Sequence, residues 1–93
     1  VVGDADLQDD WAVADAIKHR RTDVALRELA LAFDAGKPKE MILGQLRFIV
    51  ERNLDSSRVP TAVEALYRTD FALKTSAGNT RVLLERLVVE LCQ

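Results

Sequence analysis

Residues 59–74 read VPTAVEALYRTDFALK, and this segment sets the pattern for the whole chain. At about 100° per residue four of its apolar side chains share one stripe, which predicts an amphipathic helix. These stripe residues are Val59, Val63, Leu66 and Leu73. Asp70 falls within the same stripe, and a carboxylate there is costly unless a cation pairs with it. Lys74 lies four residues further on, within side-chain reach, so we expect an acid–base pair on this helix.

Composition indicates one ordinary folded domain. The 93 residues are 48% hydrophobic and 30% charged, which allows a modest core. A net charge of −2 argues against a general nucleic-acid binder, which is usually strongly basic. Cys92 is the only cysteine, so no internal disulfide can form, and we expect a cytoplasmic protein. No apolar run is long enough to cross a bilayer.

Apolar periodicity and capping residues predict further helices on both sides of this segment. The predicted helices span residues 11–20, 23–35, 38–52, 59–76 and 80–92. Thr22 and either Asn79 or Thr80 are expected N-caps, and Gly36 is the expected left-handed residue after the second helix. Gly44 lies inside a helix, where it predicts a close helix crossing. Because the turns are short, the sequence predicts an all-α antiparallel bundle of about five helices.

The chain begins at Val1 without a methionine, which suggests a fragment of a longer protein. Residues 1–10 are acidic, and we expect them to be a linker. Trp11 shares the inner face of the first predicted helix with Ala14 and Ile17, because they recur three residues apart. We therefore interpret Trp11 as a core anchor.

The sequence contains no recognisable catalytic, cofactor or metal site. His19 is the only histidine, and no nucleophile elbow or phosphate-binding glycine loop accompanies it. Lys18, His19, Arg20 and Arg21 form a basic cluster. This cluster has two interpretations: a solvated helix end, or a contact site for phosphates or an acidic neighbour. The contact site is the weaker interpretation, because no aromatic residues that could stack on bases are interleaved with these charges.

The order of these pieces resembles the C-terminal domain of the delta subunit of bacterial DNA polymerase III, a subunit of the clamp loader. In this family an acidic residue is followed four positions later by lysine, as Asp70 is by Lys74, and a Gln-Leu-Arg on the third helix matches Gln45, Leu46 and Arg47. The segments with the resemblance are DDWAVADAI, the αα-hairpin TDVALRELALAFDAGKPKEMILGQLRFIV, then VEALYRTDFALKT and NTRVLLERLVVELC. The family usually has further helices where this chain has only the turn from 52 to 60, so this chain resembles a shortened form of the domain.

The resemblance implies a non-catalytic role in assembly. Clamp-loader subunits pack through their C-terminal domains into a collar that holds their AAA+ modules in a ring. On this basis residues 11–93 are expected to be an oligomerisation domain, with residues 1–10 as the linker from a preceding AAA+-like module. The expected partners are the other clamp-loader subunits, or a second copy when the fragment is isolated, and direct DNA binding is not expected. The candidate structural or interface residues are Asp70, Lys74, Gln45, Arg47 and Trp11.

Two other interpretations remain open from the residues alone. One is an unrelated small helical adaptor or regulatory domain that binds another protein. The other is a helical nucleic-acid-binding domain, which would need a basic face that the charge balance does not supply. The Asp70–Lys74 pair likewise has two interpretations: a half-exposed surface pair, or a buried pair that fixes the register of helix packing or meets a neighbouring subunit. A buried pair would make Asp70→Ala more destabilising than Lys74→Ala.

Overall fold

The computed structural model describes residues 12–75 and 78–93 and confirms the all-α prediction. The predicted linker 1–10 and Trp11 lie outside these ranges. A helical segment covers residues 12–18. It is followed by α2 (Thr22–Asp34), α3 (Lys39–Asn53), α4 (Val59–Lys74) and α5 (Thr80–Cys92).

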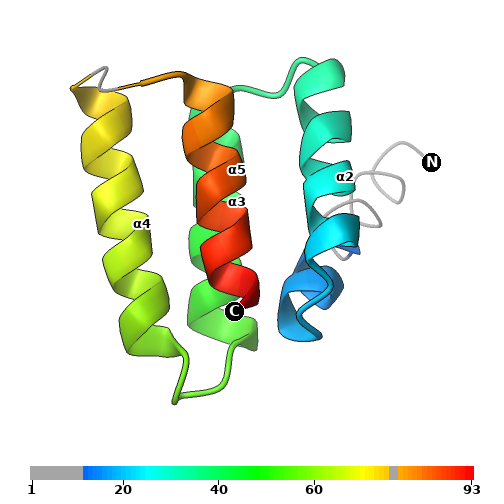
Figure 1. Ribbon diagram of the computed structural model, residues 1–93, viewed down its shortest axis with the longest axis vertical. Helices are drawn as coiled ribbons and strands as arrows, with labels where there is room; N and C mark the ends of the chain where they lie inside the picture. Colours follow the sequence, from blue (N-terminus) through cyan, green and yellow to red (C-terminus); the bar gives the residue numbers. More distant parts are fainter. Residues whose placement is uncertain (1–11, 76–77) are drawn as a thin grey trace.

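The helices form a bundle in which α5 lies in front of α3, with α2 and α4 on either side (Figure 1). α4 packs against both α5 and α3, and α2 packs against α5. The αα-hairpin predicted from the second and third helices is therefore looser than expected, because α2 packs more closely against α5 than against α3. The helical segment 12–18 lies near the base of α2 (Figure 1).

Local signals define several helix ends as predicted. The Asn79 side chain caps α5 by accepting from the backbone N–H groups of Arg81 and Val82, at 2.9 and 3.2 Å. Gly36 follows α2 with φ +77°, the left-handed conformation expected of a glycine at this place. The prediction for Thr22 is wrong, because α2 begins at Thr22 itself and no side chain caps it.

The segment 12–18 ends through a non-glycine residue in the left-handed conformation. Arg20 has φ +60°. Its N–H donates to the Ile17 carbonyl at 3.2 Å, and the Arg21 N–H donates to the Ala16 carbonyl at 2.8 Å. This pair of bonds is the Schellman arrangement, which is most often built with glycine because a Cβ is strained there.

The apolar stripe of α4 is centred differently from the prediction. Its buried residues are Ala62, Ala65, Leu66, Thr69 and Leu73. Val59, Val63 and Asp70 are only partly buried, at the edge of this face. The alanines explain the difference, since they contribute little to hydropathy but allow neighbouring helices to approach closely.

The prediction that Gly44 marks a close helix crossing is wrong for the described residues. Gly44 is exposed on α3, and a Cβ added there would have no neighbour within 4 Å. Met41 and Phe48, on the same side of α3, are also exposed. The inward side of α3 holds its core residues, which are Ile42, Leu43, Leu46, Ile49 and Val50.

Candidate functional site

The Asp70–Lys74 pair lies at the surface. The Lys74 ammonium is 3.0 Å from the Asp70 carboxylate, and the two side chains are 75% and 25% exposed. Both residues border a depression of about 320 Å³ between α3 and α4, together with Lys39, Glu40 and Leu43 on the α3 side. A half-exposed pair four residues apart contributes only about 0.3–0.5 kcal/mol, so it is not a buried determinant of packing.

Gln45 and Arg47 point to opposite sides of α3. Gln45 borders a depression of about 220 Å³ that Val13 and Leu31 also line, where the segment 12–18, α2 and α3 meet. Arg47 instead borders a depression of about 250 Å³ shared with α4, next to Tyr67. The structure therefore does not bring Gln45 and Arg47 together.

Large apolar side chains surround Gln45 on the outside of the bundle. Leu31, Met41 and Phe48 are each about half exposed. Met41, Gln45 and Phe48 follow one another at the spacing of a single helix face, and Leu31 joins them across the depression. The Arg52 guanidinium lies 5.2 Å from the centre of the Phe48 ring. We call Leu31, Met41, Gln45 and Phe48 the α2–α3 face.

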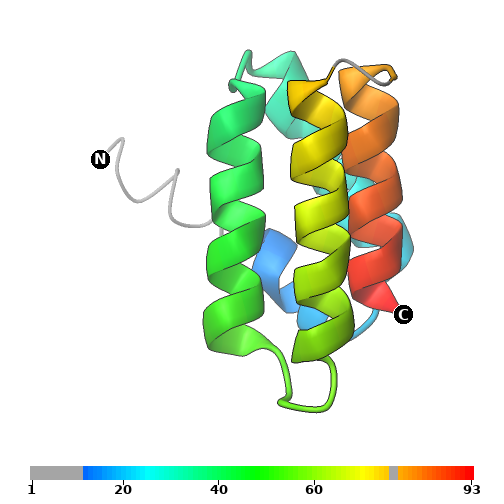
Figure 2. The same cartoon turned by 90° about the vertical axis from the view of Figure 1, so that its left-hand side faces the viewer.

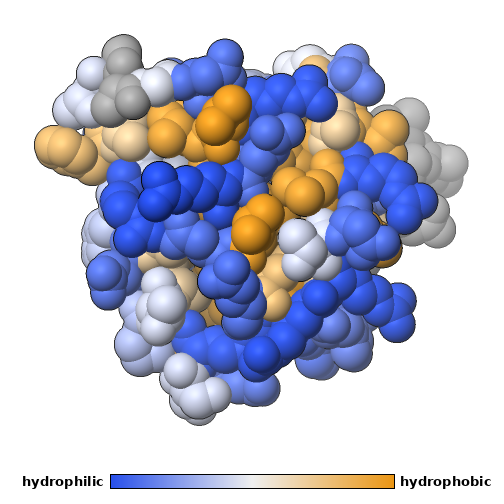
Figure 3. All heavy atoms as spheres, viewed as in Figure 1, coloured by the Kyte–Doolittle hydropathy of each residue, from blue (hydrophilic) through white to orange (hydrophobic). Residues whose placement is uncertain are grey.

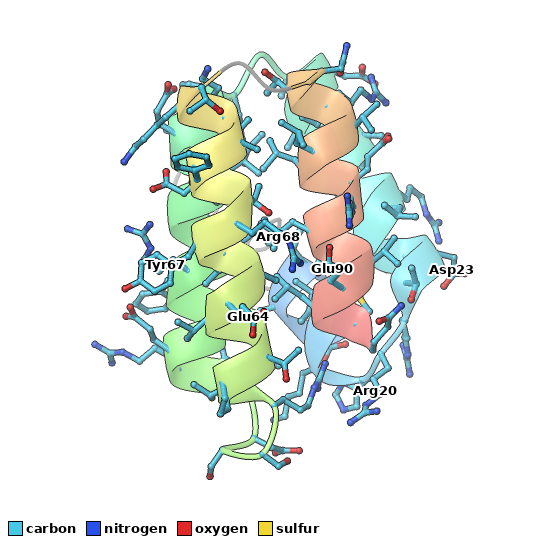
Figure 4. The ribbon with its side chains drawn as sticks, turned by 60° about the vertical axis from the view of Figure 1, so that its left-hand side comes forward. Arg20, Asp23, Glu64, Tyr67, Arg68 and Glu90 are labelled. Carbon is cyan, nitrogen blue, oxygen red and sulfur yellow. The ribbon has the colours of Figure 1, made fainter. Side chains whose placement is uncertain are left out.

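A second exposed apolar surface runs along α4. Tyr67 and Phe71 are 71% and 70% exposed, one helical turn apart. Glu64 and Lys74, both exposed, continue the same line toward the two ends of the helix. Figure 2 shows α4 between α3 and α5, and no other described helix covers its outer side. In Figure 4 Tyr67 points away from the bundle. We call Glu64, Tyr67, Phe71 and Lys74 the α4 outer stripe.

Charged side chains join α4 to α5 on the neighbouring surface. Arg68 of α4 pairs with Glu90 of α5, and the two side chains point toward each other in Figure 4. Arg86 approaches the other oxygen of Glu90 at 3.2 Å. Apolar residues also reach the surface near the C-terminal end of α4, between charged ones (Figure 3). The exposed rim between α4 and α5 therefore carries ion pairs, unlike the two apolar surfaces.

Arg58, in the turn before α4, forms hydrogen bonds with the segment 12–18 and with α5. Its guanidinium donates to the carbonyl oxygens of Ile17 at 3.1 Å and Lys18 at 3.2 Å, and to that of Leu91 at 2.5 Å. These carbonyls belong to the C-terminal ends of the segment 12–18 and of α5, where a cation is favoured by the helix dipole. The sequence suggested only a polar turn here, and nothing in the local pattern indicates this role.

Cys92 lies in the same region and is buried. Burial raises the pKa of its thiol, while a hydrogen bond with Thr22 and the charge of Arg58 act in the opposite direction. A buried, neutral thiol behaves as a small apolar residue, so this position is part of the core.

The basic cluster is exposed at the end of the first helical segment. His19 Nδ1 is 3.0 Å from the Asp15 carbonyl oxygen and 3.2 Å from its carboxylate. Within residues 12–75 and 78–93, Lys18, Arg20 and Arg21 have no ion-pair partner. The cluster is exposed, which agrees with both interpretations, because a site for phosphates or an acidic neighbour would also be open in the isolated chain.

No group of three or more His, Cys, Asp or Glu side chains that could hold a metal ion occurs in the described part of the chain. Among the same residues, no helix combines the length and the apolar character needed to span a membrane. No protein-family model, curated protein or solved structure matches the chain.

Proposed function

We propose that residues 11–93 are a non-catalytic assembly domain, the C-terminal collar domain of a clamp-loader delta subunit in shortened form. The order of its helical segments and the Gln-Leu-Arg at 45–47 support this proposal through their resemblance to that family. Its partners are the C-terminal domains of the other clamp-loader subunits. This role belongs to DNA replication in the cytoplasm.

The α2–α3 face is the observation on which the proposal depends. Leu31, Met41 and Phe48 expose large apolar surface around the amide of Gln45, beside a shallow depression. Exposed apolar side chains grouped around a few polar ones are the anatomy of a protein–protein interface. The face also includes Gln45, one of the positions that match the family.

Light-scattering chromatography of this chain with the C-terminal domains of the same organism's other clamp-loader subunits tests the proposal. We expect a stable mixed complex with at least one of them. Phe48→Glu should abolish that complex, because it replaces the largest apolar side chain of the face by a charge. Phe71→Glu is the matched control, since it makes the same change at another exposed phenylalanine outside the face, and it should leave the complex intact.

Failure of the unaltered chain to bind any of these domains would refute the clamp-loader assignment and favour the unrelated helical adaptor. Equal loss of binding in both variants would show that the α2–α3 face is not the contact.

A further inference from the structure

We propose that the α4 outer stripe is a self-pairing surface, on which a second copy of this chain docks with its α4 antiparallel to the first. The inference goes beyond the proposed function and uses a different face. The partner is a second copy of this chain, because the order of charged and aromatic residues along the stripe is complementary to itself.

The spacing of the stripe is that of a helix-pairing seam. Glu64, Tyr67, Phe71 and Lys74 are separated by three, four and three residues, as are the contact positions of a coiled coil. All four are exposed, and they lie on the side of α4 opposite its buried residues, such as Ala65 and Thr69. α4 therefore has one face for the core and a second for an external helix.

The order of residues along the stripe is complementary to itself. In an antiparallel pair whose two-fold axis passes at the level of residue 69 along the helix, Tyr67 of one copy meets Phe71 of the other, and Glu64 meets Lys74. A two-fold axis repeats both contacts, so the dimer gains two aromatic pairs at its centre and two ion pairs at its ends. A parallel pair would instead place Glu64 against Glu64 and Lys74 against Lys74.

The charges are available for these contacts. Glu64 makes no ion pair among the described residues. Lys74 already contacts Asp70 at 3.0 Å, but its side chain is 75% exposed, and an ammonium has three donors. One ammonium can therefore bridge Asp70 of its own helix and Glu64 of the second copy. Glu64 lies on α4, as Arg68 does, and takes no part in the Arg68–Glu90 pair between α4 and α5 (Figure 4).

The length of α4 sets the strength of the association. Its 16 residues extend about 24 Å, which is a small contact for two proteins. A contact of this size with two aromatic pairs predicts a weak dimer, with a Kd on the order of 10 µM.

Sedimentation equilibrium of the whole chain from about 1 µM to 1 mM measures this association. Glu64→Lys and Lys74→Glu should each weaken the dimer about tenfold, because both ion pairs become repulsive. An equimolar mixture of the two variants should recover near-normal dimerisation, since each end of the mixed pair then joins a lysine of one chain to a glutamate of the other. Circular dichroism of each variant establishes that it remains folded.

Tyr67→Ala should weaken the dimer about a hundredfold, because the substitution removes the ring from both symmetry-related aromatic contacts. Val82→Ala is the control, since it truncates an exposed apolar residue on α5 that belongs to neither named surface, and it should not change the Kd. A chain that remains monomeric at 1 mM would overturn the proposal and leave the stripe to another partner. A mixture that stays as weak as its components would overturn the antiparallel register. Neither result would affect the complex attributed to the α2–α3 face.

Discussion

Replacing Arg58 by methionine should destabilise the whole bundle, although the residue lies in a turn. Methionine keeps most of the apolar stem and removes the guanidinium that donates to Ile17, Lys18 and Leu91. The bonds to Ile17 and Leu91 are partly buried, whereas the bond to Lys18 is exposed, where water can replace the donor. At about 1.5 kcal/mol for each partly buried charge-assisted bond, the expected loss is about 3 kcal/mol.

Urea unfolding followed by far-UV circular dichroism measures this loss directly. The midpoint should fall while the m-value stays unchanged, because the same surface is exposed on unfolding. For a domain of this length, a loss of about 3 kcal/mol lowers Tm by about 12–24 °C. Arg58→Lys should give an intermediate loss, since one ammonium keeps the charge near both helix ends but cannot reach three carbonyls in the fixed fork of a guanidinium.

Arg27→Met is the control for this experiment. Arg27 is exposed on α2, so the same change of side chain there should alter the free energy of unfolding by no more than about 0.5 kcal/mol. If Arg58→Met behaves like Arg27→Met, the three carbonyls are satisfied equally well by water, and the role assigned to Arg58 is refuted.

The remaining predictions concern helix ends, the surface pair and the buried thiol. Gly36→Ala should lower the free energy of unfolding by about 1 kcal/mol in urea, because φ is +77° and an added Cβ would gain no packing contact there. Arg20→Gly should raise it by about 0.5–1 kcal/mol, because glycine adopts the left-handed conformation at φ +60° without strain. Asp70→Ala and Lys74→Ala should each change stability by less than about 0.5 kcal/mol, and a loss above about 2 kcal/mol in either would contradict the surface placement of the pair. Because burial raises the pKa of Cys92, the unfolded chain releases this proton at lower pH than the folded one. Stability should therefore fall as pH rises above about 8.5, and urea unfolding at two pH values should show a smaller fall in Cys92→Ala.

The helices and several of their ends follow from local signals in the chain. Apolar periodicity locates α2 to α5 to within a few residues, because the spacing of side chains around a helix is fixed by the backbone. Asn79 and Gly36 act at the positions expected of them, since a cap depends on neighbouring backbone groups alone. The formation of an Asp70–Lys74 contact also follows from spacing within one helix.

What surrounds each helix was decided only in the tertiary structure. The core face of α4 is centred on alanines, whose weak hydropathy gives little signal, and this moves Asp70 to the edge and Lys74 into solvent. Gly44 lies on an open surface, because helical periodicity does not reveal which neighbour is present.

Arg58 is the clearest case of a role that no local pattern contains. Its three acceptors are 33 to 41 residues away in the chain, so they meet only after the helices have packed. The exposure of Tyr67 and Phe71 has a related origin: helical spacing places them off the predicted stripe, but only the packing of α4 leaves that side uncovered by another described helix. Local backbone geometry determines the helices, and long-range packing determines which of their side chains remain available to a partner.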